Sequence, residues 1–382
     1  MIEINEALSL INGQAWAHRS VRVKTVQSVG HVIFEPIYAQ LDLPSFDNSA
    51  MDGYAVFGDG TKFKLVGEIA AGQIIYDRLK AGEAMRIFTG ARVPEGTSAV
   101  VKQELAILNG DQLTVSSVSK GDHIRRQAEE VRQGQLLLEA GHCISPASVG
   151  LLLSQGIVSV NVHASPKVSV LVTGDELVDP ENALVKGQIF ESNGGMLVAA
   201  LMEQNVTEVS LLRVKDDLDQ IKNQIDILLG ESDILLISGG VSVGAYDYVK
   251  EGLEANGVNE IFYRVLQKPG KPLYFGRKEN AFVFGLPGNP CAALTCFNIY
   301  VKALLAKLQG KSMLCAEIPL AEAHTAKGTK PVLLRAKITD GKATVLKNQS
   351  SSMLTTYVGG NGLILLQPGE YQAGTQVTVW YS

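Results

Sequence analysis

The amino-acid sequence predicts a multidomain protein of the α/β-plus-β class, in which a central parallel-sheet α/β domain lies between β-rich segments. The chain has 382 residues, enough for several hydrophobic cores. Residues 166–310 alternate between short apolar strands and amphipathic helices, whereas the flanking segments carry short alternating strands with frequent Gly and Pro. The first pattern predicts a parallel sheet covered by helices, and the second predicts small β-domains.

The central segment has a β-α-β-α-β order. The predicted elements are a strand at 167–176, a helix at 192–205, a strand at 208–214, a helix at 216–230 and a strand at 233–238. Ser192 is the expected N-cap of the first helix, and Gly230 is the expected stop of the second. Ligands bind beyond the carboxyl ends of parallel strands, so the loops that follow these strands are where we expect a site.

The N-terminal part contains two predicted helices and a hairpin. Residues 3–17 have a helical apolar pattern, and residues 106–118 predict a hairpin with Asn109-Gly110 at its turn. After a charged connection at 123–141, a helix is expected at 145–157, with Ser145 as its N-cap and a proline at its first position.

The C-terminal part predicts a small β-barrel. Residues 336–347 carry an Asp340-Gly341 turn, and residues 363–381 alternate between apolar and polar side chains. The predicted domains are therefore a discontinuous helical and linker domain (1–40 and 124–165), a β-rich domain (41–123), the α/β domain (166–310) and the barrel (311–382).

Composition disfavours several classes of protein. The net charge of −5 argues against broad nucleic-acid binding. The acidic, amphipathic start is not typical of a signal peptide, and no apolar run reaches the ~20 residues of a membrane span. We therefore expect a cytoplasmic protein with no membrane partner. The four cysteines form no C-x-x-C pair, which disfavours zinc and iron–sulfur sites and favours free, buried thiols.

Three loops between residues 233 and 290 carry the strongest functional signal: GGVSVGAYDY (239–248), KPGKP (268–272) and GLPGNP (285–290). Glycine lets backbone N–H groups approach an anion closely. The helix expected after Asn289 would add a positive dipole end, with Pro290 at its first position. The residues expected to form the ligand-binding loops are Gly239, Gly240, Ser242, Gly244, Pro287, Gly288, Asn289 and Pro290.

Charged residues in these loops indicate the kind of ligand. Lys268 and Lys271 supply full positive charges, and Asp247 supplies a hard oxygen ligand for Mg²⁺. The combination predicts a site for a phosphorylated or oxyanionic ligand with Mg²⁺. The loops contain neither G-x-x-x-x-G-K-[ST] nor G-x-G-x-x-G, so a P-loop NTPase or a Rossmann dehydrogenase is not indicated.

Taken in order, six motifs resemble those of the molybdopterin molybdenumtransferases: DNSAMDGYAV (47–56), TGARVPEG (89–96), VTGDEL (172–177), SGGVSVGAYDY (238–248), KPGKP and GLPGNP. The resemblance covers essentially the whole chain. It implies insertion of molybdate into adenylylated molybdopterin, with Mg²⁺-dependent release of AMP. It also implies a homodimer of four-domain subunits, with molybdopterin adenylyltransferase and molybdoenzyme chaperones as partners.

The resemblance further implies roles for single residues. Asp247 would bind Mg²⁺ with help from Asp216 or Glu176, and Lys268 and Lys271 would hold molybdate or the terminal phosphate. Arg335 and Ser351 would donate hydrogen bonds to an oxyanion, whereas Asp52 and Thr89 would act from the N-terminal region. Asp52 would reach the site of a neighbouring subunit, completing it together with the C-terminal barrel.

Each of these residues has an ordinary structural alternative. Asp247 and Asp216 could instead be solvated loop carboxylates or helix caps. Glu176 could form a surface salt bridge, and the two lysines could belong to a solvated hairpin. Asp52 is also compatible with an Asx-turn, Thr89 with a local cap of Gly90, and Arg335 with an exposed strand.

The sequence departs from the expected family pattern at RRQAEE (125–130), where RRxGED is expected, and at Arg264, where a lysine is expected. Two segments of the predicted barrel, LLRAKI (333–338) and NQSSSM (348–353), also depart from the family pattern.

Three other functions share parts of the pattern: an adenylyltransferase, a pyrophosphatase or amidase of the competence-damage type, and a non-enzymatic scaffold. The DNSAMDGYA motif separates the insertase from the first two, and retention of the acidic and lysine residues argues against the scaffold. The sequence leaves open whether molybdenum or tungsten is preferred.

Overall fold

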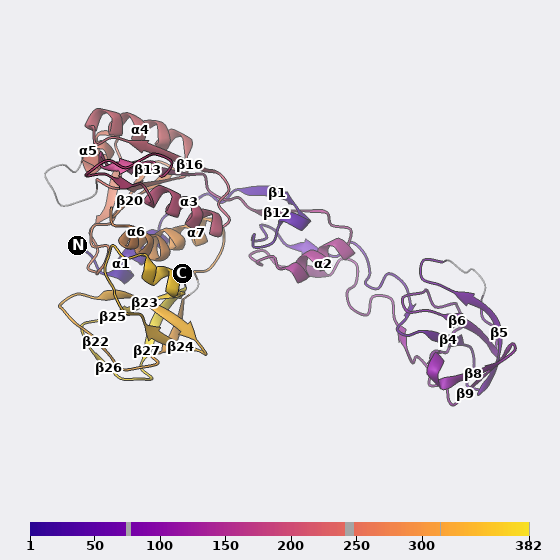
Figure 1. Cartoon of the computed structure of the whole chain (residues 1–382). Coiled ribbons are helices and arrows are strands. Elements are labelled where there is room, and N and C mark those ends of the chain that lie inside the picture. Colours follow the sequence, from indigo (N-terminus) through magenta and orange to yellow (C-terminus); the bar gives the residue numbers. More distant parts are fainter. Residues whose placement is uncertain (74–77, 241–247, 314, 382) are drawn as a thin grey trace. The chain divides into compact units, whose positions relative to one another are not determined.

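The computed structural model describes residues 1–73, 78–240, 248–313 and 315–381 (Figure 1). The chain divides into two compact units. The first comprises Met1–Arg22, Gly30–Val32 and Asn161–Ser382, and the second comprises Val23–Val29 and Ile33–Val160. The first unit contains an α/β sheet and a C-terminal β-sheet, and the second is rich in short strands.

A six-stranded sheet of order β16-β13-β17-β20-β19-β18 forms the centre of the first unit. Its parallel strands are β13 (Val168–Thr173), β16 (Val209–Val214), β17 (Ile234–Ser238) and β20 (Ala281–Leu286). β19 (Tyr274–Lys278) and β18 (Asn259–Tyr263) continue it in antiparallel fashion. The predicted parallel sheet is thus confirmed for four strands. Only Glu279 and Asn280 join β19 to β20, a link too short for a parallel crossover.

Both faces of this sheet are buried by helices (Figure 1). On one face Val168, Val170 and Val172 belong to the core that contains α1 (Ile4–Asn12), α3 (Asn193–Glu203), α6 (Pro290–Cys296) and α7 (Lys302–Leu308). On the other face Leu171 and Leu235 pack with α4 (Leu218–Glu231) and α5 (Tyr248–Ala255). Alternate side chains of each strand therefore enter different cores, as a doubly covered sheet requires.

Helix ends differ from the predictions by a few residues. α1 ends at Asn12 rather than near residue 17, because Gly13 follows as its C-cap. α4 continues through Gly230 to Glu231. Ser192 occupies the N-cap position of α3, but Glu191 supplies the capping oxygen, accepting from Gly194 N at 2.7 Å. By contrast, Ser145 forms the expected cap of α2 (Pro146–Ser154), within a capping box.

The helical run from Pro290 to Leu308 is, among the described residues, one long and apolar enough to span a membrane. Its apolar window is 78% buried, and its residues contribute to the core beneath the sheet. A π-helical turn, Phe297–Val301, joins α6 to α7 within this run. Cys291 and Cys296 lie on the run and are buried, whereas Cys143 and Cys315 are exposed. The expectation of buried thiols is therefore wrong for two of the four.

The C-terminal part forms a five-stranded antiparallel sheet of order β21-β27-β25-β23-β24. The bounds are β21 Cys315–Pro319, β23 Val332–Thr339, β24 Lys342–Val345, β25 Gly362–Leu366 and β27 Gln376–Tyr381, with β22 His324–Ala326, β26 Gly369–Tyr371 and α8 Thr355–Gly359 beside them. A bridge between Leu320 and Ala343 brings the two edges together, which gives the sheet a barrel-like curvature. The predicted Asp340-Gly341 turn joins β23 to β24 with positive φ at both residues.

The second unit is built on a six-stranded sheet of order β7-β4-β6-β5-β9-β8. The bounds are β4 Gly53–Val56, β5 Lys62–Ile69, β6 Glu83–Ile87, β7 Ala99–Lys102, β8 Ala106–Asn109 and β9 Gln112–Val115. The predicted hairpin is confirmed, but Asn109 pairs with Gln112, so Gly110 and Asp111 form the turn. Separate cores lie around Ala55 and around Val56.

The remaining strands are short. They are β1 Ser20–Lys24, β2 Ile37–Tyr38, β3 Asn48–Ser49, β10 Ile124–Arg125, β11 Leu136–Leu138, β12 Ser159–His163, β14 Leu177–Val178 and β15 Ile189–Phe190. β10 pairs with β3 and β11 with β2, so the predicted connection at 123–141 contributes two short strands.

Candidate functional site

The predicted loops meet at one edge of the α/β sheet. Thr173, Ser238 and Leu286 end parallel strands, so the segments after them emerge on the same side. β19 runs antiparallel to β20, and its first residue, Tyr274, pairs with Gly285. The KPGKP loop that precedes β19 therefore lies at the same edge as the GLPGNP loop.

The loops after β17 and β20 approach each other closely. Gly239 has a φ of +96°, and a Cβ there would lie 2.4 Å from the Thr173 carbonyl oxygen, so only glycine fits. The buried Asn193 connects the two loops: its Nδ2 donates to Ser238 Oγ at 2.9 Å and to the Gly288 carbonyl at 2.8 Å. The sequence analysis missed Asn193, although its amide directly follows the Ser192 cap position.

A cavity of about 630 Å³ lies between the KPGKP loop, the N-terminus of α6 and loops of the C-terminal sheet. The structure brings together five predicted site residues in its wall: Lys268, Lys271, Pro287, Asn289 and Ser351. Residues that the sequence analysis missed complete it, among them Gln267, Lys330, Gln349 and Ser350. Lys330 belongs to no motif and lies two residues before β23, so only the fold shows its proximity.

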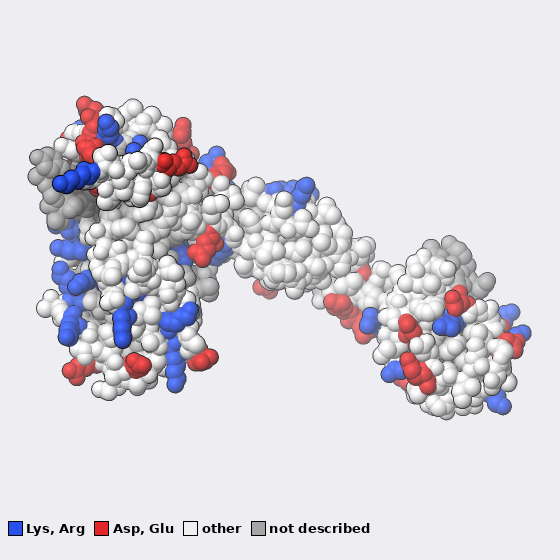
Figure 2. Space-filling model, in the orientation of Figure 1, with Lys and Arg blue, Asp and Glu red and all other residues white. Residues whose placement is uncertain are grey.

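Positive charge in this cavity is not neutralised by protein carboxylates. Lys268, Lys271 and Lys330 all line it, and the described lining residues include no Asp or Glu. Within the described ranges, none of the three lysines forms an ion pair. Figure 2 shows lysine and arginine side chains along one margin of this unit, from the α/β part to the C-terminal sheet. Such a cavity favours an anionic ligand.

The C-terminal sheet is fastened to the KPGKP loop by backbone contacts. Lys268 N donates to the Pro331 carbonyl at 3.0 Å, and Leu333 N donates to the Lys268 carbonyl at 2.8 Å. Asn289 Nδ2 also lies 3.4 Å from Ser351 Oγ, across the cavity wall. These contacts place Ser351 and Lys330 beside the two lysines. Lys268 itself is exposed, and the loop joins the antiparallel strands β18 and β19, so the solvated hairpin of the structural alternative is present and also forms one wall of the cavity.

Arg335 lies in β23 with only 1% of its surface exposed, so it is not an exposed strand residue. Its Nε donates to Thr356 Oγ1 at 2.9 Å, and its Nη2 donates to the carbonyls of Asn348 and Ser350 at 3.3 and 3.1 Å. Nη1 is buried with no partner among the described residues. Arg335 thus supports the loop that carries Ser351 and is not itself part of the cavity lining.

Two of the predicted metal ligands, Glu176 and Asp216, follow the ends of β13 and β16. Asp216 N donates to Asp175 Oδ1 at 3.3 Å, and Asp217, not Asp216, caps α4 by accepting from Gln220 N at 2.9 Å. Desolvation, together with the carboxylates of Asp175 and Glu176, raises the pKa of Asp216. A cation would relieve this repulsion, so the donor set suits Mg²⁺.

These carboxylates do not form a complete metal site by themselves. Among the described residues, no group of three His, Cys, Asp or Glu side chains is placed to hold a metal ion. Mg²⁺ characteristically takes one or two protein carboxylates together with substrate phosphates, so the pair Glu176 and Asp216 remains compatible with it. Ser242, Gly244 and Asp247 lie outside the described residues.

Asp52 and Thr89 belong to the second unit and bind each other. Asp52 Oδ1 accepts from Thr89 N at 2.8 Å and from Thr89 Oγ1 at 2.7 Å. The two bonds lower the pKa of Asp52, the backbone bond more than the hydroxyl bond. A contact between residues 37 apart in sequence is not an Asx-turn, so Thr89 holds Asp52 ionised and in a fixed orientation.

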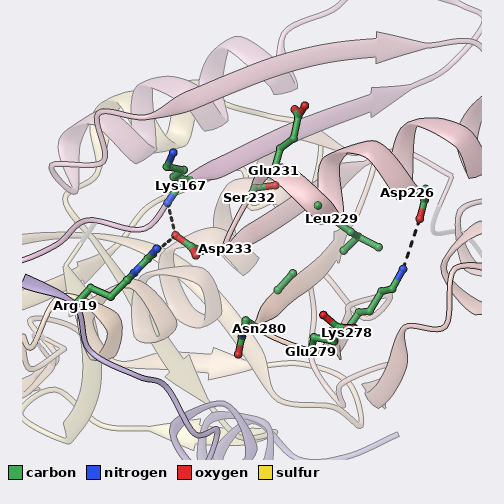
Figure 3. Close-up of a pocket in the computed structure, with 12 residues that line it drawn as sticks. Arg19, Lys167, Asp226, Leu229, Glu231, Ser232, Asp233, Lys278, Glu279 and Asn280 are labelled. Atoms are coloured by element: carbon green, nitrogen blue, oxygen red, sulfur yellow. Dashed lines mark hydrogen bonds and ion pairs between the residues drawn. The ribbon is translucent and has the colours of Figure 1, made fainter.

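A second cavity, of about 670 Å³, lies near the amino ends of β13, β17 and β20 (Figure 3). Its basic side chains are paired: Arg19 with Asp233 at 2.5 Å, and Lys278 with Asp226 at 3.5 Å. Lys167 N also donates to Asp233, as Figure 3 shows. Because these charges are compensated, we place the candidate functional site in the first cavity and not here.

Three family models match successive parts of the chain. Residues 169–307 match the family described as a probable molybdopterin binding domain. Residues 2–156 match the MoeA N-terminal region (domain I and II), and residues 317–381 match the MoeA C-terminal region (domain IV). The chain is therefore a protein of the MoeA class, whose central domain matches a probable molybdopterin binding domain.

Curated relatives identify the family. The chain is 35% identical to a molybdopterin molybdenumtransferase of Haemophilus influenzae, covering 92% of this chain and 91% of that one. It is 31% identical to the molybdopterin molybdenumtransferase of Staphylococcus aureus, covering 99% and 95%. The chain belongs to the molybdopterin molybdenumtransferase family.

Solved structures extend the likeness to the whole fold. A molybdopterin biosynthesis MoeA protein from Pyrococcus horikoshii is 28% identical, with a TM-score of 0.84 and full coverage of both chains. A second structure from that organism is 26% identical with a TM-score of 0.82, covering 100% of this chain and 99% of the other. The predicted class, an α/β domain with β-rich N-terminal domains and a C-terminal β-barrel, is confirmed.

The packing of the KPGKP loop predicts that Gly270 does not tolerate alanine. Gly270 has a φ of +83°, and a Cβ there would lie 2.5 Å from Cys296 Sγ. Gly257 has a φ of +71° with no atom near its Cβ position, so Gly257→Ala carries the backbone penalty alone. Left-handed strain costs roughly 1–2 kcal/mol in both variants, and overpacking adds about 1–3 kcal/mol in Gly270→Ala. Thermal unfolding of both variants measures the difference; equal losses of stability would contradict the packing described.

Proposed function

We propose that the protein inserts molybdate into adenylylated molybdopterin and releases AMP in a Mg²⁺-dependent reaction of molybdenum cofactor biosynthesis. The observation that carries this proposal is the cavity beside the N-terminus of α6, where three lysines meet no carboxylate among the described lining residues. The names of the relatives and the match to a probable molybdopterin binding domain supply the substrate class.

The mechanism follows from charge. Molybdate is a dianion and the adenylylated substrate is also anionic, so their approach is repulsive unless fixed cations offset it. Lys268, Lys271 and Lys330 supply those cations, and the described part of the lining holds no carboxylate to compete for them. Ser351 and the backbone at Asn289 orient the oxyanion. The two dithiolene sulfurs of the substrate then bond to molybdenum, and their thiol protons leave with a displaced molybdate oxygen as water. Hydrolysis of the adenylate releases AMP and the finished cofactor.

Glu176 and Asp216, with Asp247, are the residues that we propose hold Mg²⁺. Bound there, Mg²⁺ would supply Lewis-acid polarisation of the substrate's phosphate oxygens, which would weaken the bond to AMP. The carboxylates would hold the ion, and the lysines of the cavity would hold the oxyanion. We propose that the roles are divided in this way along the edge of the sheet.

Release of AMP from adenylylated molybdopterin tests the proposed function. With Mg²⁺ present, molybdate should stimulate the release, and active cofactor should appear. Lys271→Met removes a charge-assisted contact worth about 1.5–3 kcal/mol, which corresponds to roughly 10- to 100-fold weaker use of molybdate. Lys278→Met, at the paired cavity of Figure 3, is the matched control and should keep its activity.

Two results would contradict the proposal. Absence of AMP release from the wild-type protein under all these conditions would favour a scaffold. Equal losses of molybdate-stimulated AMP release in Lys271→Met and Lys278→Met would show that the cavity lined by Lys271 has no special role.

The proposed metal site gives a separate prediction. Asp216→Asn removes a carboxylate whose pKa is raised by its surroundings, so the concentration of Mg²⁺ needed for half-maximal AMP release should rise about tenfold or more. Asp219→Asn, in the first turn of α4, removes an equal charge nearby and should leave that concentration unchanged. An unaltered Mg²⁺ requirement in Asp216→Asn would exclude Asp216 from the site.

We further propose that the protein acts as a cytoplasmic homodimer, divided into the four domains expected from the sequence. In this proposal Asp52, oriented by Thr89, completes the site of the neighbouring subunit. Molybdopterin adenylyltransferase would supply the substrate, and molybdoenzyme chaperones would receive the product. The long-range bond that fixes Asp52 supports a role other than a local turn.

Mixing two inactive variants tests whether the site is shared. The assay uses a molybdate concentration at which Asp52→Asn and Lys271→Met are each nearly inactive. In a heterodimer of the two variants, a shared site leaves one of the two sites with both native residues. Random assortment should then restore roughly a quarter of the wild-type activity. If Asp52 serves its own subunit, every site keeps one lesion and the mixture stays inactive.

A further inference from the structure

The KPGKP loop is hydrogen-bonded to a buried polar pair, Gln267 and Tyr300, that lies outside the motif. Gln267 is 1% exposed and Tyr300 is fully buried. The Tyr300 hydroxyl donates to Gln267 Oε1, and Gln267 Nε2 donates to the Gly270 carbonyl at 3.0 Å. Burying an amide and a phenol costs free energy unless both are hydrogen-bonded. These two bonds satisfy the buried polar groups of Gln267 and Tyr300, which packing of the core alone would not need.

Tyr300 reaches Gln267 from the π-helical turn Phe297–Val301. A π-turn inserts a residue into a helix and shifts the direction of its side chains, and such turns often occur at functional sites. Cys296 packs beside the pair, with its Sγ 3.7 Å from the Gly270 carbonyl oxygen and 3.6 Å from Gln267 Nε2. Burial raises the pKa of Cys296 to about 12, so this neighbour is a neutral thiol and brings no negative charge under the loop.

The bond from Gln267 sets the direction of one peptide dipole in the cavity wall. It turns the Gly270 carbonyl towards the buried side of the loop. The Gly270–Lys271 peptide is planar and trans, so the Lys271 N–H points the opposite way, out of the buried pair. A carbonyl facing the cavity would repel an anion, whereas an N–H attracts one.

We propose that Gln267 and Tyr300 are positioning residues for the oxyanion: they hold the Gly270–Lys271 peptide with its carbonyl inward and so keep the KPGKP wall attractive to molybdate. The inference rests on the proposed function, in that it assumes an oxyanion in this cavity. It adds that the affinity for the oxyanion depends on two uncharged, buried side chains, of which Gln267 belongs to the cavity lining and Tyr300 does not.

Gln267→Met and Tyr300→Phe remove the hydrogen bonds while nearly preserving volume. Each should weaken binding of molybdate, measured on the full chain by equilibrium dialysis, by about tenfold, and should raise the KM for molybdate with kcat nearly unchanged. The double variant should be no weaker than Gln267→Met, because both residues act through the same carbonyl. If Gln267→Met does not fold, Tyr300→Phe carries the test alone.

Tyr274→Phe is the matched control. Tyr274 lies in β19, is 1% exposed and lies outside the lining of the cavity, so its loss of a buried hydroxyl should leave molybdate binding unchanged. Variants that bind molybdate like the wild type, or that lose only stability and kcat, would overturn the positioning role while leaving the proposed function intact. A wild-type protein that binds no molybdate and uses none would overturn the proposed function, and the positioning role with it.

Discussion

Two backbone hydrogen bonds between Lys268 and the start of β23 are the contacts on which the candidate site depends. They connect the KPGKP loop of the α/β sheet to the C-terminal sheet, through the Pro331 carbonyl and Leu333 N. Together with the packing of Leu333, Leu363 and Trp380 in the core of the α/β domain, they hold Lys330 and Ser351 beside Lys268 and Lys271. With them, three lysines surround one cavity and repel one another, a cost that a bound anion relieves.

Acidic and basic groups gather at different places along this edge of the sheet. Asp175, Glu176 and Asp216 gather where β13 and β16 end, and their mutual repulsion, added to desolvation, raises the pKa of Asp216. The lysines gather beyond β20, where a helix N-terminus faces the same side. Cationic and anionic groups thus lie at one edge without neutralising each other, which suits a substrate that carries phosphate oxygens and meets a second anion.

The sequence predicted the local parts of this arrangement well. The Ser145 cap and the Asp340-Gly341 turn follow from short-range rules, and the structure has them. Contacts between distant segments were beyond those rules. Lys330 carries no motif, the Tyr300–Gln267 bond joins residues 33 apart, and a buried Arg335 is not distinguishable from an exposed one in a strand pattern. The π-helical turn that directs Tyr300 towards Gln267 likewise could not be predicted from the spacing of apolar residues along the helix. One departure from the family pattern can be related to backbone conformation. Ala128 replaces the expected glycine and adopts a φ of +59°. Glycine adopts this conformation without strain.

The most direct test of the central claim is the location of a heavy oxyanion in the protein. Crystals soaked in tungstate, which has the shape and charge of molybdate, should show an anomalous peak in the cavity lined by Lys268, Lys271, Lys330 and Ser351. That peak should disappear in Lys271→Met crystals soaked in the same way. A peak confined to the paired cavity of Figure 3, or one unchanged in Lys271→Met, would contradict the account.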